Sequence, residues 1–283
     1  MTVRARGRMR SRARQAAEGS PVSDHALDEY LFEAEQRGAL HQVDGRRVVL
    51  DVTRDPVTDE QLTFLSYADD ELWLADSALT GWLSNVRAGS AVVVRSTSGE
   101  APSGRWRVLV RHVLLDAVGD AYVGRRSVAR IRRADGRADD EFVAWCLAEA
   151  IRVGYAARAV VDGGIAALVD DVMEDPSRRS WVAEAPDGER IGQLTVRSCD
   201  DNLSLGLIGA RTELVDTYAT QDVGAVIDDL LTEALPSLEL PVAATVTSPA
   251  PERERAILAG LASKGWRTAA VDWASLDDTA EVG

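Results

Sequence analysis

The spacing of hydrophobic residues divides the first half of the chain into one helix and a series of short strands. Leu27, Tyr30, Leu31 and Ala34 recur at helical spacing, which predicts a helix from about Ser23 to Gly38. Short runs rich in Val, Leu, Phe and Trp follow and predict strands at 47–52, 61–67, 71–75, 90–96 and 105–115, with a helix at 77–86. This half predicts a small, mostly antiparallel β-sheet or barrel that carries one or two helices.

From about residue 127 the pattern alternates between strands and helices. Strands are predicted at 128–133, 181–185, 190–196, 211–219, 242–247 and 266–273, and helices at 139–152, 163–173, 224–234 and 252–263. The turn Pro186-Asp187-Gly188-Glu189 joins two of the strands into a hairpin. The pattern predicts an α+β fold with a mixed sheet flanked by helices. The predicted organisation is a flexible arm at 1–22, a mostly-β domain at 23–125, a mixed domain at 126–275 and an acidic tail at 276–283.

The charge is strongly uneven along the chain. The 283 residues include 46 Asp and Glu against 32 Lys and Arg, a net charge of −14. The first 20 residues contain six arginines and one glutamate, so the arm has a charge of +5 and the remainder −19. Such a body repels nucleic acid, which only the arm could contact, and it suits a cationic or amine-bearing partner. Solubility alone would also account for the acidity, and the arm could be an inert tail.

Several classes of chemistry lack the residues they need. Cys146 and Cys199 form no CxxC pair, so a metal knuckle is not expected and a reducing, cytoplasmic compartment is. All three histidines precede residue 113, so the second half cannot contain a histidine-based triad. No apolar run approaches the ~18 residues of a membrane span, and the arginine-rich start lacks the apolar core of a secretory signal.

The segment 212–231 predicts a strand, a short loop and a helix that begins at once. This arrangement points free backbone N–H groups and the positive end of a helix at one place, which suits an anion such as a pyrophosphate. Gly224 would allow a close approach to the backbone. A plain strand–loop–helix connection would give the same pattern.

Residues 127–273 resemble the GNAT superfamily of acyl-CoA-dependent N-acyltransferases. The resemblance rests on the two helices after the first strand, the hairpin 181–194, the loop Gln221-Asp222-Val223-Gly224-Ala225-Val226, and the closing helix that ends in Lys264-Gly265-Trp266. It implies that acetyl-CoA or another acyl-CoA is the co-substrate. The implied contacts to the coenzyme are Ala219, Thr220, Gln221, Asp222, Val223, Gly224, Ala225, Val226 and Ser248.

The resemblance also implies the catalytic groups. Glu213 stands at the usual place of the general base, and Asp216, expected on the opposite face of the same strand, is the second candidate. The implied proton donor to the leaving thiolate is Tyr218, Ser248 or solvent. The sequence departs from the family pattern at Val226, where a small residue is usual and a β-branched side chain would crowd the phosphates, and at Leu261, where a tyrosine is often found.

The resulting hypothesis is an N-acyltransferase that moves an acyl group directly from acyl-CoA to the amine of a small molecule, a peptide or a protein. The alternative is a GNAT-fold protein that has lost catalysis and serves as a binding or assembly module. A DNA-associated regulator that uses the arginine arm is a third reading. The first half is loosely similar to flavin-binding split barrels and could equally be a second, diverged GNAT-like unit; it would shape acceptor access or a homodimer.

Overall fold

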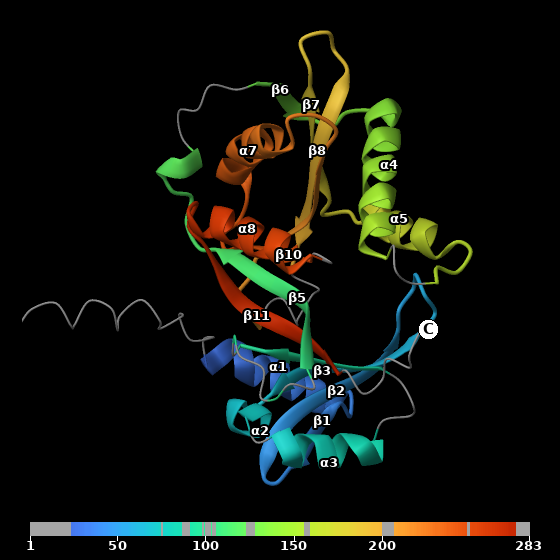
Figure 1. Cartoon of the computed structure of the whole chain (residues 1–283), viewed down its shortest axis with the longest axis vertical. Helices are drawn as coiled ribbons and strands as arrows, with labels where there is room; N and C mark the ends of the chain where they lie inside the picture. The colour runs from blue at the N-terminus through green and yellow to red at the C-terminus, as the bar shows by residue number, and fades with distance from the viewer. Residues whose placement is uncertain are drawn as a thin grey trace, which may run out of the picture.

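Eleven strands of the described residues form one mixed β-sheet at the centre of the molecule, with helices packed against it (Figure 1). The computed structural model describes residues 24–74, 76–86, 91–97, 99, 103, 106–122, 128–155, 159–199, 207–247 and 250–275. The order of the strands across the sheet is β1-β2-β3-β4-β11-β5-β10-β9-β8-β7-β6. The prediction of a mixed sheet flanked by helices is confirmed. The arm at 1–22 and the tail at 276–283 lie outside the described residues.

The first half contributes the strands at one end of the sheet. Its elements are α1 (Asp24–Gln36), β1 (Leu40–Val43), β2 (Arg46–Arg54), β3 (Gln61–Ala68), α2 (Asp70–Leu74), α3 (Asp76–Val86), β4 (Ala91–Ser96) and β5 (Trp106–Leu115). Val48 of β2 packs with α2 and α3, whereas its neighbour Val49 packs with α1. Because successive side chains of a strand point to opposite faces, these helices cover opposite faces of the sheet.

The second half has the order of elements that its sequence predicts. Its elements are β6 (Arg130–Arg133), α4 (Arg137–Gly154), α5 (Gly164–Glu174), β7 (Arg179–Glu184), β8 (Arg190–Ser198), β9 (Thr212–Ala219), α7 (Val223–Ala234), β10 (Val242–Val246), α8 (Pro251–Ala262) and β11 (Trp266–Ser275), with short 3-10 turns at Asp120–Tyr122 and Leu235–Ser237. Val182 packs under α4 and α5, whereas Trp181 and Ala183 pack under α7. Figure 1 shows these two helix layers on either side of the upper strands.

The two halves exchange their last strands. β5 lies between β10 and β11, and β11 lies between β4 and β5, so each half completes the sheet of the other. Trp273 of β11 lies 6.1 Å from Trp73 between ring centroids, and Trp106 of β5 lies 5.1 Å from Trp73. These three indoles bury the end of the second half's chain in the core of the first half. The boundary near residue 125 stays a prediction. Strand β5 of the first half and strand β11 of the second half each pair with strands of the other half.

Both halves also contain the same local arrangement. In each, two parallel strands are joined by helical segments: β3 and β4 by α2 and α3, and β9 and β10 by α7. Antiparallel strands extend the sheet outward from β3 and from β9. This repeat favours a second unit of the same architecture over a split barrel.

One predicted strand is wrong, and one observed strand was not predicted. Residues 71–75 were expected to be extended, but 70–74 form α2, in which the amides of Leu72 and Trp73 donate to the carbonyl of Asp69. Leu72 and Trp73 are both buried, so consecutive apolar residues mark a short helix wedged into the core. β1 was not predicted because only one of its four residues is fully buried.

The loop between β2 and β3 connects the first half to the helices of the second. The hydroxyl of Tyr155 donates to Asp55 at 2.9 Å, and the amide of Val161 donates to the carbonyl of Val57 at 2.8 Å. Gly164, at the start of α5, lies against the same loop, where an added Cβ would come within 2.5 Å of the Pro56 carbonyl oxygen. The first half therefore supports the α4–α5 pair directly.

Replacing Gly164 with alanine is expected to lower the free energy of unfolding by about 1 to 3 kcal/mol, because backbone atoms would have to move to admit the methyl group. Urea denaturation measures this change. Gly260→Ala is the control: this glycine lies in α8 with open space around it, and alanine favours a helix by up to ~1 kcal/mol. Equal stability of Gly164→Ala and the wild type would show that the contact contributes nothing.

Among the described residues, no helix combines the length and the apolar character that crossing a membrane requires. Within the same residues, no group of three or more His, Cys, Asp and Glu side chains is placed to hold a metal ion.

Candidate active site

The parallel strands β9 and β10 separate part of the way along their length. They pair only from Thr212 opposite Val242 to Leu214 opposite Ala244. Beyond that point β9 continues to Ala219 and pairs with β8 alone. Every residue of β9 from Glu213 to Ala219 is partly exposed, although the strand lies well inside the sheet. Beyond Leu214 the edge of β9 is therefore not paired with β10, and we call the space between the carboxyl ends of these two strands the cleft.

The helix α7 begins at the outer end of this cleft. Asp222 precedes it in a left-handed conformation (φ 41°, ψ 43°) and its side chain does not cap the helix. The amides of Ala225 and Val226 donate to the carbonyl of Asp222, so the first turn leaves the amides of Val223 and Gly224 without an intrahelical acceptor. Gly224 is exposed, and a Cβ added there would meet nothing within 4 Å. The start of α7 can thus admit an anion close to its backbone.

Val226 does not obstruct this end of the helix. Its side chain is fully buried and packs in the core beneath α7. It therefore points away from the expected position of the phosphates, and the predicted crowding does not arise. Gly192 of β8 makes room for it, since a Cβ on Gly192 would lie 2.8 Å from Cγ1 of Val226. The departure from the family pattern at Val226 is accommodated inside the protein.

A β-bulge changes which way the side chains of β9 point. Thr195 lies opposite Asp216 and Val196 lies opposite Leu214, so Val215 is an extra residue in the strand. Asp216 therefore lies on the same face as Glu213, and the predicted placement on opposite faces is wrong. That face is the one covered by α4 and α5, because Asp216 acts electrostatically on Cys146 of α4.

Asp216 lies in the part of β9 that no longer pairs with β10. Burial raises the pKa of its carboxyl group to about 7, against 3.8 ordinarily, although hydrogen bonds from the Thr217 amide and the Gln193 side chain act in the other direction. Nε2 of Gln193 donates to Oδ2 of Asp216 at 2.6 Å. On α4, burial raises the pKa of the Cys146 thiol to about 12, so this neighbour stays uncharged. A carboxyl group that titrates near neutral pH is suited to accept and release a proton.

Glu213 is held in an ion pair. Nε of Arg197 donates to its carboxylate at 2.7 Å, and Arg197 also lies 3.4 Å from Asp171 of α5. Glu213 lies opposite Ala243, in the stretch where β9 and β10 are still paired. The two carboxyl groups therefore differ in their partners, since Glu213 is bound by an arginine and Asp216 by the amide of Gln193.

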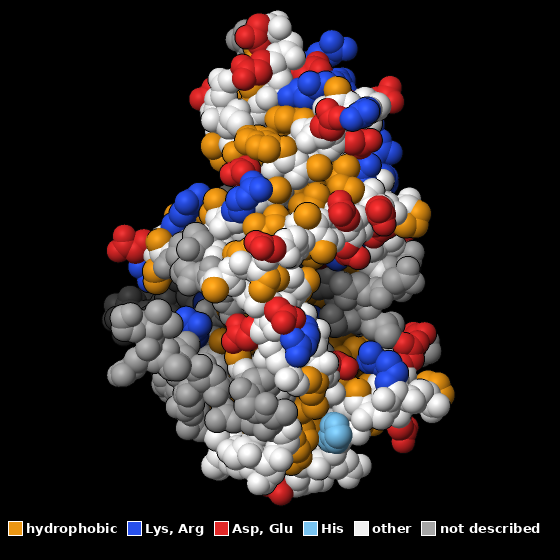
Figure 2. Space-filling view, turned by 90° about the vertical axis from the view of Figure 1, so that its right-hand side faces the viewer, with side chains coloured by type: hydrophobic (Ala, Val, Ile, Leu, Met, Phe, Trp, Pro, Cys, Tyr) orange, Lys and Arg blue, Asp and Glu red, His pale blue; other side chains and the backbone are white. Residues whose placement is uncertain are grey.

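Aromatic side chains line the α4 side of the cleft. Tyr218 meets Trp145 edge to face, with 5.6 Å between ring centroids, and Trp145 stacks on Phe142 at 6.1 Å. Trp145 is 45% exposed, which is unusual for an indole and marks an accessible wall. Figure 2, which views the molecule from the side of α4 and α5, shows hydrophobic side chains there among acidic and basic ones.

The other predicted site residues differ in their backbone contacts and exposure. The amide of Thr220 donates to the Ile191 carbonyl and is occupied, whereas strand alternation directs the amide of Ala219 away from β8 into the opening. Gln221 is exposed between the strand and the helix. Ser248 lies outside the described residues. The sequence pattern did not identify Gln193 and Trp145. The only signals it offered were a polar amide within a predicted strand and a tryptophan within a predicted helix.

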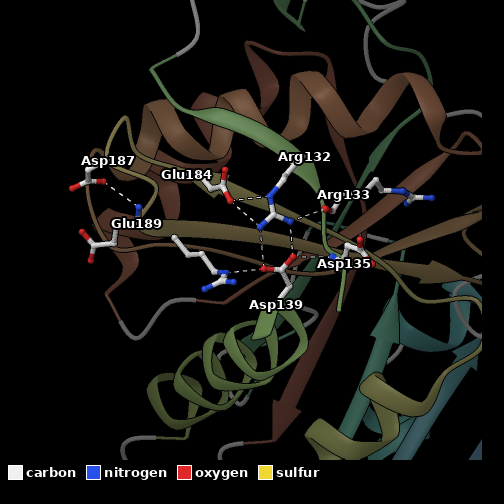
Figure 3. Close-up of polar contacts among 8 residues, drawn as sticks. Arg132, Arg133, Asp135, Asp139, Glu184, Asp187 and Glu189 are labelled. Carbon is white, nitrogen blue, oxygen red and sulfur yellow. Dashed lines mark hydrogen bonds and ion pairs between the residues drawn. The ribbon is translucent and has the colours of Figure 1, made fainter. Parts of the chain in front are cut away.

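An ion cluster joins the edge strand β6 to the start of α4 (Figure 3). Arg132 of β6 binds Asp139 through two nitrogens and also binds Glu184 of β7, and Arg190 of β8 donates to Asp139 at 2.7 Å. The amide of Asp135 donates to the same carboxylate at 2.8 Å. Mainly through its bond to Arg132, the pKa of Asp139 is held far below its ordinary value. This cluster ties three strands to the helix that carries Trp145.

The corresponding opening in the first half is closed. β3 and β4 pair as far as Leu65 opposite Val94, and the next residue, Ser66, bonds to the hydroxyl of Tyr30 from α1. Both side chains are buried. The carboxylate of Asp69, just before α2, accepts from the Arg47 amide at 2.8 Å and from the Tyr67 hydroxyl at 2.5 Å. An anionic ligand would therefore meet a filled core and a resident carboxylate at this second position.

Comparison with known proteins gives distant structural neighbours. No protein-family model matches the sequence, and no curated protein is significantly similar to it. A GCN5-related N-acetyltransferase from Kribbella flavida is 10% identical, with a TM-score of 0.43 over 91% of this chain and 96% of its own. A tandem GNAT protein from the clavulanic acid biosynthesis pathway is 13% identical, with a TM-score of 0.40 over 87% of each chain.

A probable N-acyltransferase from Enterococcus faecalis V583 is 10% identical, with a TM-score of 0.40. This match spans 81% of the present chain but only 57% of the Enterococcus protein. These names belong to the family that residues 127–273 resemble.

Proposed function

We propose that the protein is an N-acyltransferase that moves an acyl group from acyl-CoA to an amine. The observation that carries this proposal is that two sites of different chemistry lie along the same cleft. At one end, the start of α7 offers backbone amides to an anion, as the pyrophosphate of coenzyme A would require. On the α4 side, Asp216 offers a carboxyl group that titrates near pH 7. The opening between β9 and β10 joins them and gives the pantetheine arm a strand edge to pair with.

The chemistry requires only one base and one hydrogen-bond donor. Asp216 takes a proton from the ammonium group of the acceptor, and the nitrogen lone pair then attacks the thioester carbonyl. The amide of Ala219 stabilises the oxyanion as the new C–N bond forms. The C–S bond then breaks as the attacking nitrogen loses its second proton, which passes through Tyr218 or solvent to the leaving thiolate. Cys146 is buried and uncharged, which agrees with direct transfer instead of an acyl-enzyme.

The surroundings of the cleft suit a cationic acceptor. The chain has a net charge of −14, and the exposed aromatic ring of Trp145 next to Tyr218 can attract a cation through its face. We therefore propose a primary amine on a small molecule or a peptide as the acceptor. The two free, buried cysteines fit a reducing, cytoplasmic compartment.

The experiment is calorimetric titration of the protein with acetyl-CoA and with a longer acyl-CoA. Micromolar binding is expected. Gly224→Asp is expected to weaken it by roughly 30- to 1000-fold, because the new carboxylate and the pyrophosphate would repel each other by about 2 to 4 kcal/mol. An aspartate in the first turn favours a helix, so lost binding would not result from unfolding.

Gly224→Ala is the matched control. The methyl group has open space, so affinity should stay within a few-fold of the wild type. Absence of heat with every acyl-CoA would overturn the proposal and favour the binding or assembly module. Equal binding by Gly224→Asp would place the coenzyme elsewhere.

A further inference from the structure

A row of buried polar side chains leads from the surface to Asp216. Ser180 of β7 and Thr195 and Gln193 of β8 are almost completely inaccessible. Oγ of Ser180 lies 2.9 Å from Oγ1 of Thr195, the Thr195 hydroxyl donates to Oε1 of Gln193 at 2.7 Å, and Nε2 of Gln193 donates to Asp216 at 2.6 Å. At the outer end, Arg178 donates to Oγ of Ser180 at 3.2 Å. Burying three polar side chains in a sheet is costly unless each is satisfied, and here each is.

Both ends of the row impose the same direction on its hydrogen bonds. A guanidinium can only donate, so Ser180 accepts from Arg178 and has its own hydrogen for Thr195. An ionised carboxylate can only accept, so the amide nitrogen of Gln193 faces Asp216 and its oxygen faces Thr195. Every donor in the row then points toward Asp216. The reverse direction would leave the hydrogen of Ser180 without an acceptor in the row.

We propose that Ser180, Thr195 and Gln193 are positioning residues that lock the Gln193 amide with its N–H on Oδ2 of Asp216, the carboxyl group that takes the proton of the acceptor. This inference rests on the proposed function, since it assigns the orientation of the base. Without the Thr195 hydroxyl, the amide of Gln193 could turn over. Its carbonyl would then face the carboxylate and repel the ionised form.

The row is the adjustable influence on Asp216, because among the described residues no charged side chain is a cause of the shift in its pKa. Few titratable groups in this part of the chain lie around it. Cys146 approaches from α4, with Glu149 acting on that thiol, and Glu213 on the same strand is bound by Arg197 of β8. Tyr218 lies two residues further along the strand. Arg178 itself is bound to Asp140 at 2.9 Å, so it enters the row as a fixed donor.

The test is the titration of Asp216 by carbon NMR of its carboxyl group, in the full chain without acyl-CoA. Thr195→Val keeps the shape of the side chain and removes the hydroxyl, and it is expected to move the titration midpoint upward by ~1 pH unit. Thr195→Ser should restore the wild-type midpoint. Ser180→Ala, one step further out and less disruptive to the fold, should give a smaller shift in the same direction.

A midpoint that stays within ~0.2 pH unit in both Thr195→Val and Ser180→Ala would overturn the proposal. This readout needs no acyl transfer, so its failure is distinct from a failure of the proposed function. Where transfer is measured, the pH–rate profile of Thr195→Val should move upward with the NMR midpoint while KM for acyl-CoA is unchanged. A lower rate without a shifted profile would indicate a purely structural role.

Discussion

Replacing Asp216 with asparagine is expected to reduce acyl transfer at pH 7.5 by about 100- to 10,000-fold, the usual loss when a general base is removed. Affinity for acyl-CoA should change little, because Asp216 lies away from the start of α7. The wild-type rate should rise with pH through an inflection near 7, where the buried carboxyl group loses its proton. Release of coenzyme A, followed with a thiol reagent, measures both effects.

The same substitution is expected to stabilise the protein above pH 7. The pKa of Asp216 is about 7 in the folded chain and 3.8 ordinarily, so between these values the native state retains a proton that the unfolded state has lost. Stability from this group is complete below about pH 4 and falls as the pH rises to 7. Asparagine does not titrate, so the variant should be more stable at pH 8 by about 2 kcal/mol, a value reduced for the partial exposure of the site.

Urea unfolding at pH 4.5 and pH 8 measures the free energy of unfolding with Asp216 protonated and with Asp216 ionised. The gain from Asp216→Asn should appear at pH 8 and nearly vanish at pH 4.5. Asp170→Asn is the control, since this exposed carboxylate on α5 should change neither activity nor stability. If Asp216→Asn is active, or is less stable than the wild type at pH 8, Asp216 is an ordinary structural aspartate.

Replacing Asp139 with asparagine is expected to cost about 3 kcal/mol of unfolding free energy at pH 7, because two arginines lose their buried carboxylate. The value lies at the lower end of the range for buried pairs, since Arg132 is partly exposed and retains Glu184. The lowered pKa of Asp139 means that its stabilising effect is present above about pH 4 and is lost as the pH falls below it. The difference between variant and wild type should therefore shrink in acid.

Glu141→Gln on the same helix is the matched control. Its partner Arg137 is 92% exposed, so this pair should contribute less than ~0.5 kcal/mol. Equal losses in the two variants, measured by urea denaturation at pH 7, would show that the cluster in Figure 3 is no more than a surface pair.

The helices and strands of the second half could be predicted because their hydrophobic residues alternate regularly. The same holds for the start of α7, where Thr220 to Asp222 separate β9 from the helix. The helix at 70–74 could not, because Leu72 and Trp73 are adjacent apolar residues that read equally well as a strand. Short apolar runs do not distinguish the two.

The features that organise the site depend on contacts between distant residues. The bulge at Val215, which turns Asp216 toward α4, appears only when β9 is aligned with β8. The exchange of β5 and β11 places strands some 160 residues apart side by side, as the contact between His112 and Asp272 illustrates. No local pattern encodes such pairings, so the sequence suggested Glu213 first and missed Gln193.

Hydrogen–deuterium exchange with and without acetyl-CoA tests the central claim, that an acyl-CoA occupies the cleft between β9 and β10. Peptides that cover 215–226 are predicted to exchange more slowly when the ligand is present, because the coenzyme would cover the open edge of β9 and the free amides of α7. The corresponding segment of the first half, 62–74, should be unchanged, because Tyr30 and Asp69 already fill it. Unchanged exchange at 215–226, or slower exchange at 62–74 alone, would contradict the account.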